Sequence, residues 1–134
     1  MASDPALERR FQKVFLNPPN IKETYDILKA LRPGHERHHG VSISNLSLML
    51  IIYLTNEHMR RRNQPDKAII TMDAAMAFQV KEHGKGEEVS LDSVYYMIGR
   101  ETGLNKQALH DEKLIQRVMK HVKEVEGESV LYYI

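Results

Sequence analysis

A nearly uninterrupted apolar segment in the first half of the chain constrains its fold most. It comprises Leu46 and every residue from Leu48 to Leu54, and it follows Ser44, a residue type that often caps a helix. A surface helix has one apolar and one polar face, whereas this segment is apolar on nearly every side. It is also far shorter than the roughly 20 residues that span a bilayer. The segment therefore predicts a central helix surrounded by other helices.

One helix that could cover this segment is predicted before it. The helix opens at Asn20, which has capping-box spacing with Glu23, and it continues past Pro33 to a glycine cap at Gly40. Apolar residues recur along it at helical spacing, at Ile21, Tyr25, Leu28 and Leu31.

Three more helices are predicted after the central segment. The first of them begins near Pro65. The second begins after Ser90 and ends near Gly103, and the third runs from about His110 to Glu126. Their apolar residues recur at helical spacing: Ile69, Met72, Met76 and Val80, then Leu91, Val94, Tyr95 and Ile98, then Leu114, Ile115, Val118, Met119, Val122 and Val125. A length of 134 residues is typical of about one domain. The predicted fold class is all-α, a small helical bundle.

The arginine run from Arg60 to Arg62 allows two interpretations. Positive charge in the last turn of the central helix would complement the helix dipole. A basic run can also contact nucleic acid. The chain has 19 basic and 18 acidic residues and a net charge of +1, so no general field attracts nucleic acid or an anionic membrane. The helix end is therefore the preferred interpretation, and neither nucleic acid nor membrane is an expected partner.

Cysteine usage and the N-terminal residues bear on the compartment. The chain has no cysteine, which excludes disulfides and thiolate chemistry, and its first residues form no apolar signal core. A chain without cysteine fits a reducing compartment, where disulfides are rare. We expect a cytoplasmic or organelle-matrix location.

The motifs that bind and hydrolyse ATP are missing from the sequence. Such chemistry needs a glycine-rich GxxxxGK[ST] loop for the phosphates and a strand that ends in an acid for Mg²⁺. The glycines here stand singly or as the Gly84-x-Gly86 pair, with no lysine and serine or threonine behind them. ATP hydrolysis by this chain alone is not expected.

Three histidines in the first predicted helix raise the hypothesis of a metal site. His35, His38 and His39 are spaced so that imidazoles can meet on one helix face. No cysteine is available and no well-placed carboxylate is evident, so no metal site is expected. Serine, histidine and aspartate occur in no arrangement typical of a catalytic triad.

Six motifs, taken in order, resemble one protein family. They are Ala6–Gln12 (Ala-Leu-Glu-Arg-Arg-Phe-Gln), Leu28–Arg32, His38–Val41, the helix at Ser44–Arg62, Gln64–Ile69 (Gln-Pro-Asp-Lys-Ala-Ile) and Thr102–Asn105. In these motifs the chain resembles the Clp family of AAA+ unfoldases, specifically the small helical lid of the first ATPase module and the connector toward the second. The long insertion that ClpB carries after this lid is absent, which favours a ClpA- or ClpC-like parent.

The resemblance implies roles for seven residues. Arg9 and Arg10 would be catalytic as arginine fingers, because a guanidinium can neutralise charge on the γ-phosphate of the ATP of a neighbouring protomer. The residues implied to contact the protomer's own nucleotide are Ile27, Leu28, Pro65, Asp66 and Lys67. Core packing accounts equally well for Ile27 and Leu28, and a helix cap for Asp66 and Lys67.

The family resemblance also implies cofactors, partners and a function. The parent protein would use ATP or ADP with Mg²⁺, with none held tightly by this chain alone. Its partners would be the other protomers of a Clp hexamer, unfolded protein clients and a ClpP-like peptidase. The implied function is that of a fragment of an ATP-dependent Clp-type unfoldase. The alternative is a free-standing helical interaction module, derived from that lid, that binds no nucleotide.

Three regions are predicted along the chain. Residues 1–19 would form the arginine-finger segment and the strand or loop that leads into the lid, 20–104 the lid, and 105–134 a connector helix with an apolar, strand-like tail. Three positions depart from the family pattern: Gln64 stands where a leucine is usual, Ile70 where an acid is common, and Asn105 where a proline is usual.

Overall fold

The computed structural model describes residues 17–127, and within that range the chain forms six helices and no strand. The all-α prediction is therefore confirmed. Two short segments are joined by a single parallel bridge between Ser42 and Glu88. The helices are α2 (Ile21–His39), α3 (Asn45–His58), α4 (Asp66–His83), α5 (Leu91–Thr102), α6 (Lys106–Leu109) and α7 (Glu112–Val125).

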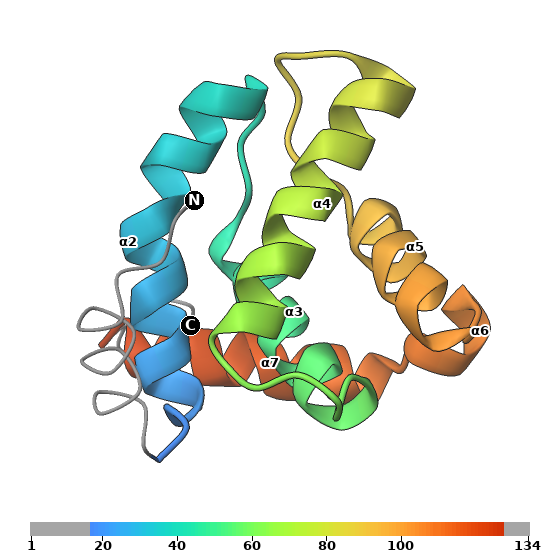
Figure 1. The fold of residues 1–134 in the computed structure, drawn as a ribbon. Coiled ribbons are helices and arrows are strands. Elements are labelled where there is room, and N and C mark those ends of the chain that lie inside the picture. Colours follow the sequence, from blue (N-terminus) through green and yellow to red (C-terminus); the bar gives the residue numbers. More distant parts are fainter. Residues whose placement is uncertain (1–16, 128–134) are drawn as a thin grey trace, which may run out of the picture.

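Helix α3 is the centre of the bundle, as its apolar sequence predicts. Every residue from Leu48 to Ile52 is fully buried, and helices α2, α4, α5 and α7 all pack against α3. In Figure 1, α2 and α4 rise on the near side of α3, α5 stands beside α4, and α7 crosses the lower end of the bundle. A helix with neighbours all round has no need of a polar face.

The predicted helix starts and stops agree closely with the structure. Asn20 and Glu23 form the capping box of α2: the Asn20 side chain accepts from the Glu23 amide at 2.8 Å, and the Glu23 carboxylate accepts from the Asn20 amide at 3.0 Å. Ser44 and Ser90 cap α3 and α5 in the same position. Gly40, at φ 75°, ends α2 in the left-handed conformation that glycine adopts without strain.

The end of α3 differs from the prediction. The helix stops at His58, so Arg60–Arg62 lie in the α3–α4 loop and are not its last turn. The physical reason lies at Met59, which leaves helical geometry while its carbonyl accepts a hydrogen bond from the Lys67 ammonium at 3.2 Å. A partner from the next helix thus replaces the intrahelical one.

The C-terminal part of the bundle contains one helix that the sequence pattern did not indicate. The short α6 follows α5, capped by Asn105, whose side chain accepts from the Ala108 amide at 2.9 Å. Asp111 then caps α7, which confirms the last predicted helix. The predicted strand-like tail lies outside the described residues.

Helix α7 is joined to the rest of the bundle by side-chain hydrogen bonds at two points along its length. Near its middle, the Tyr53 hydroxyl of α3 lies 2.6 Å from Nδ1 of His121. At its C-terminus, Glu126 accepts hydrogen bonds from the Tyr25 hydroxyl at 2.9 Å and from the Lys29 ammonium. Across residues 17–127, no helix combines the length and the apolar character that crossing a membrane requires.

Candidate functional site

The predicted site residues fall into three groups. Arg9 and Arg10 lie outside the described residues. Ile27 and Leu28 are on α2, and Pro65, Asp66 and Lys67 are at the start of α4. Helices α2 and α4 pack against each other, so the two described groups belong to adjacent elements.

The two α2 residues occupy different environments. Leu28 is fully buried and belongs to the hydrophobic core. Ile27 is partly exposed. Of this pair, only Ile27 therefore offers apolar surface to a ligand outside the bundle.

Pro65 fixes the start of α4 and is itself buried. Its peptide bond to Gln64 is cis, and its carbonyl accepts the first hydrogen bond of the helix, from the Ile69 amide at 3.0 Å. Asp66 is exposed in the first turn, where a negative charge is favourable beside the positive end of the helix dipole.

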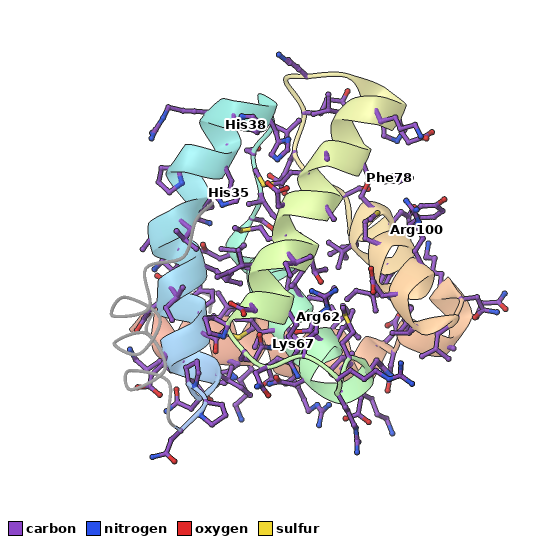
Figure 2. The ribbon with its side chains drawn as sticks, in the orientation of Figure 1. His35, His38, Arg62, Lys67, Phe78 and Arg100 are labelled. Carbon is purple, nitrogen blue, oxygen red and sulfur yellow. The ribbon has the colours of Figure 1, made fainter. Side chains whose placement is uncertain are left out.

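Lys67 points into the protein. Its residue is only 7% exposed, and its ammonium donates to the Met59 carbonyl at 3.2 Å. Burial, and then the nearby charge of Arg60, lower the pKa of Lys67. The side chain therefore holds the α3–α4 loop in place, and Figure 2 shows it near the lower end of α4.

Gln64 joins two helices in this region, although from the sequence it was noted only as a departure from the family motif. Its side-chain amide donates to Thr55 Oγ1 and Asn56 Oδ1, both at 2.9 Å, and its carbonyl oxygen accepts from the Ala68 amide at 3.2 Å. The residue thus joins the last turn of α3 to the first turn of α4. The sequence signal for this role was a polar residue directly before the proline at a predicted helix start.

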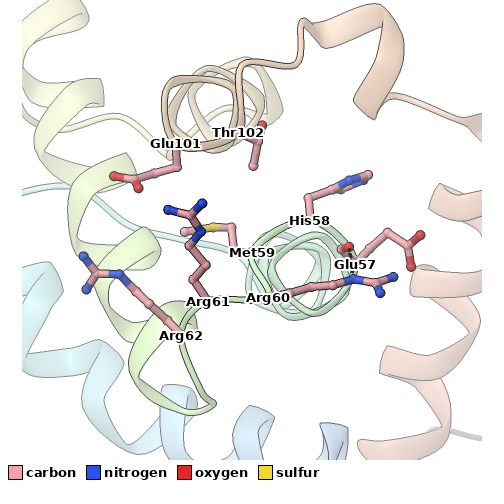
Figure 3. A pocket seen from close by; sticks show the side chains of 8 residues that line it. All are labelled: Glu57, His58, Met59, Arg60, Arg61, Arg62, Glu101 and Thr102. Atoms are coloured by element: carbon pink, nitrogen blue, oxygen red, sulfur yellow. Dashed lines mark hydrogen bonds between the residues drawn. The ribbon is translucent and has the colours of Figure 1, made fainter.

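A solvent-open cavity of about 780 Å³ lies between the α3–α4 loop and the end of α5. Figure 3 shows Arg60, Arg61 and Arg62 around one side of it, with Glu101 and Thr102 of α5 opposite. The lining also includes Glu57, so the three guanidinium groups share the cavity with two carboxylates. Such mixed charge is typical of a polar contact surface more than of a dedicated anion site.

The expectation that no carboxylate stands near the first-helix histidines is wrong. Asp73 of α4 lies between His35 and His39, with its Oδ1 atom 2.9 Å from His35 Nδ1 and 2.7 Å from His39 Nε2. The contact is distant in sequence and arises because α2 and α4 pack together. His38 lies outside this group.

Comparison with known families gives a match over most of the chain. The model of the AAA lid domain family matches residues 20–126. Those bounds take in all six described helices.

Two curated relatives are proteins called Chaperone protein ClpB. The one from Prochlorococcus marinus is 42% identical over 87 residues, which are 64% of this chain and 10% of the relative. The one from Brucella suis is 33% identical over 132 residues, which are 94% of this chain and 15% of the relative. The chain thus spans a small part of the length of these relatives. Both carry the ClpB name, whereas the absent insertion favoured a ClpA- or ClpC-like parent.

A solved structure of similar fold is the Saccharomyces cerevisiae Hsp104–ADP complex. Its sequence is 29% identical and its TM-score is 0.63, over 74% of this chain and 18% of that one. The similarity therefore extends to both sequence and three-dimensional arrangement.

Proposed function

The chain belongs to the AAA lid domain family of the Clp-type AAA+ chaperones, and on that premise we propose that it serves as the nucleotide-responsive lid of an ATP-dependent protein unfoldase. The observation that carries this proposal is the family match across all six described helices. The solved structure of similar fold is a complex of Hsp104 with ADP, and this supports a role for the present chain beside a nucleotide.

In the proposed lid, the residues of this chain meet only the purine end of the nucleotide. Ile27 supplies exposed apolar surface on α2, and Pro65 fixes the adjoining start of α4. An apolar wall with few polar groups suits a flat base. Leu28 and Lys67 support that wall from inside, because one is core and the other ties down the α3–α4 loop.

The phosphates and Mg²⁺ would belong to the large ATPase subdomain of the parent protein. This chain has no glycine-rich loop that could hold them. ATP supplies the γ-phosphoryl group whose transfer to water drives the parent's cycle. A lid that packs on the base changes its tilt when the nucleotide changes, which is a hinge motion of a rigid helical body.

Arg9 and Arg10 are proposed as arginine fingers that act on the ATP of a neighbouring protomer. Two adjacent guanidinium groups suit a γ-phosphate because each offers a planar fork of donors. The proposed partners are accordingly other protomers of a hexamer and unfolded protein clients, with a ClpP-like peptidase as a further one.

ATP hydrolysis by a chimaera tests this proposal. The full chain is joined to the large ATPase subdomain of a ClpB relative, and steady-state phosphate release is measured. We expect hydrolysis by the chimaera and a loss with Arg9→Ala or Arg10→Ala, since such fingers contribute about 10³–10⁵ in rate in other phosphoryl-transfer systems. The exposed Arg37→Ala, on α2, is the matched control and should leave the rate unchanged.

Two outcomes would count against the proposal. One is a chimaera that hydrolyses ATP no faster than the large subdomain alone. The other is a rate that depends on Arg37 as much as on Arg9 and Arg10. Either result would make a free-standing interaction module the better account.

A further inference from the structure

The pairing of α2 with α4 places two imidazoles and one carboxylate at a single point. His35 and His39 are four residues apart on α2, so their side chains leave the helix on the same face. Asp73 comes from α4 and lies against both. Each residue offers one ligand atom, and these three atoms all lie within 4.8 Å of one another. We refer to His35, His39 and Asp73 as the α2–α4 triad.

The geometry of the triad is close to that of a three-residue metal site. Tetrahedral Zn²⁺ has bonds of about 2.0–2.2 Å, which sets its ligand atoms roughly 3.4 Å apart. The Asp73 Oδ1 atom is now 2.9 Å from His35 Nδ1 and 2.7 Å from His39 Nε2. Small rotations of the three side chains would therefore admit an ion between them.

The surroundings of the triad hold the rings and leave the carboxylate accessible. The side chain of His39 is 12% exposed and that of His35 is 25% exposed, whereas that of Asp73 is 48% exposed. An ion could therefore reach the triad from the solvent side, and a water could complete its coordination. The His38 ring meets the His39 ring edge-on, with centroids 4.7 Å apart, which limits rotation of His39. Figure 2 shows His35 and His38 in the last turns of α2.

The donor set selects a class of ion. Two imidazole nitrogens and one carboxylate oxygen suit Zn²⁺ and its neighbours Co²⁺, Ni²⁺ and Cu²⁺, whereas Mg²⁺ and Ca²⁺ prefer oxygen ligands. Among the residues from 17 to 127, this is the one group of three histidine or acidic side chains placed to share an ion.

We propose that the α2–α4 triad binds a divalent transition-metal ion, with Zn²⁺ as the best fit, through His35 Nδ1, His39 Nε2 and a carboxylate oxygen of Asp73. The bound ion links the C-terminal half of α2 to α4 and so stiffens one end of the helical bundle. The site requires no nucleotide, and it stands whether or not the chain acts as a lid.

The test is a metal titration of the full, tag-free chain after treatment with a chelator. Zn²⁺ is titrated by calorimetry and Co²⁺ by visible absorption, because tetrahedral Co²⁺ has a strong characteristic spectrum. We expect one ion per chain, a tetrahedral Co²⁺ spectrum that Zn²⁺ abolishes, and a rise in Tm with added Zn²⁺, since an ion that binds the folded state stabilises it.

Variants then locate the site. His35→Ala, His39→Ala and Asp73→Asn should each weaken Zn²⁺ affinity more than about tenfold, because even indirect supporting residues of metal sites contribute about 10–100-fold. The control is His38→Phe, which keeps a ring beside His39 but removes its nitrogens; it should bind as the parent does. Circular dichroism checks that each variant is folded.

Three results would overturn the proposal, and the first needs no variant. In the first, the parent chain fails to bind one Zn²⁺ or its Tm does not rise with Zn²⁺. In the second, Zn²⁺ affinity is unchanged in His39→Ala and Asp73→Asn. In the third, His38→Phe loses as much Zn²⁺ affinity as the variants of the triad. The last two would assign any binding to other histidines of the chain.

Discussion

At the scale of single residues, side chains at the start of α4 and just before it hold the end of α3 and the α3–α4 loop in place. Gln64 bonds to Thr55, Asn56 and the Ala68 amide, and Lys67 bonds to the Met59 carbonyl. These contacts fix the α3–α4 loop, which leads into the start of α4 at Pro65. The same loop carries Arg60–Arg62 into the cavity of Figure 3.

Removal of the Gln64 side chain should destabilise the bundle. Gln64→Ala deletes three hydrogen bonds, one of them to the buried Thr55 hydroxyl, so we expect a loss of about 1–3 kcal/mol in the free energy of unfolding. Urea unfolding followed by circular dichroism measures it, which suits a chain without tryptophan. The exposed neighbour Asn63→Ala is the control, and an equal loss there would contradict the assignment.

Glu126 gives the bundle a pH-dependent contact. The hydrogen bond from Lys29 lowers the pKa of Glu126 below its usual 4.5. Burial opposes this shift, and the hydrogen bond from Tyr25 adds to it. Burial, and then the bond to Glu126, raise the pKa of Tyr25. A carboxyl group whose pKa is lowered by folding stabilises the folded state at pH values above its usual pKa. That stabilisation is lost as the pH falls through the pKa of the folded state.

Glu126→Gln should therefore cost stability at neutral pH and little in acid. We expect about 1 kcal/mol at pH 7, and a difference from the parent that shrinks as the pH falls below about 4. Urea unfolding at a series of pH values measures it. Glu124→Gln, an exposed site on the same helix, should show no such trend. A constant difference at all pH values would refute the charge-based explanation.

Residue-level prediction from the sequence was uneven for a physical reason. A carboxylate at 73 completes a histidine pair only because α2 and α4 pack together, which no local pattern reveals. The inward direction of Lys67 likewise depends on where the Met59 carbonyl lies. The roles of all seven predicted site residues toward a nucleotide stay predictions.

At the scale of elements, local chemistry predicts the helix boundaries that neighbouring residues set, including the glycine caps that end α2 and α5, and misses the end of α3. Asn20, Ser44 and Ser90 cap their helices through bonds to residues three positions on, which are visible in the sequence. The end of α3 depends instead on Lys67 of another helix, and its position was predicted wrongly. Helix α6, one turn long, has too few residues for any periodicity to show.

Gly99 and Gly34 offer a matched test of the α5–α6 turn. The turn at Gly103 brings the Leu104 carbonyl oxygen to 2.5 Å from where a Cβ at position 99 would stand. Gly99→Ala should therefore cost about 1–3 kcal/mol, as overpacking does. A Cβ at Gly34, in the C-terminal half of α2, meets only the Arg37 side chain at 3.9 Å.

Gly34→Ala should accordingly leave stability unchanged or raise it by up to about 1 kcal/mol, because alanine is the better helix former. Urea unfolding of the two variants side by side measures both effects. Equal changes in the two would show that the close approach of Leu104 does not matter.

At the scale of the whole molecule, the six helices share one core, and α7 belongs to it. Val118 of α7 is fully buried, and α7 packs against α3 while its end is bonded to α2. The all-α class followed from the central apolar segment together with the helical spacing of the segments around it, because a helix without a polar face needs neighbours on every side. The predicted boundary near residue 104, between lid and connector, stays a prediction.

ADP binding measured by isothermal calorimetry tests the central claim most directly, in three samples: the chain alone, the large ATPase subdomain of a ClpB relative alone, and the two joined. We predict no binding by the chain alone and at least about tenfold tighter binding by the joined protein than by the large subdomain, because the lid adds an apolar wall to the base. In the joined protein, Ile27→Ala should weaken binding, and the exposed Ala77→Ser on α4 should not. Equal affinity of the large subdomain with and without this chain would contradict its role as a nucleotide lid.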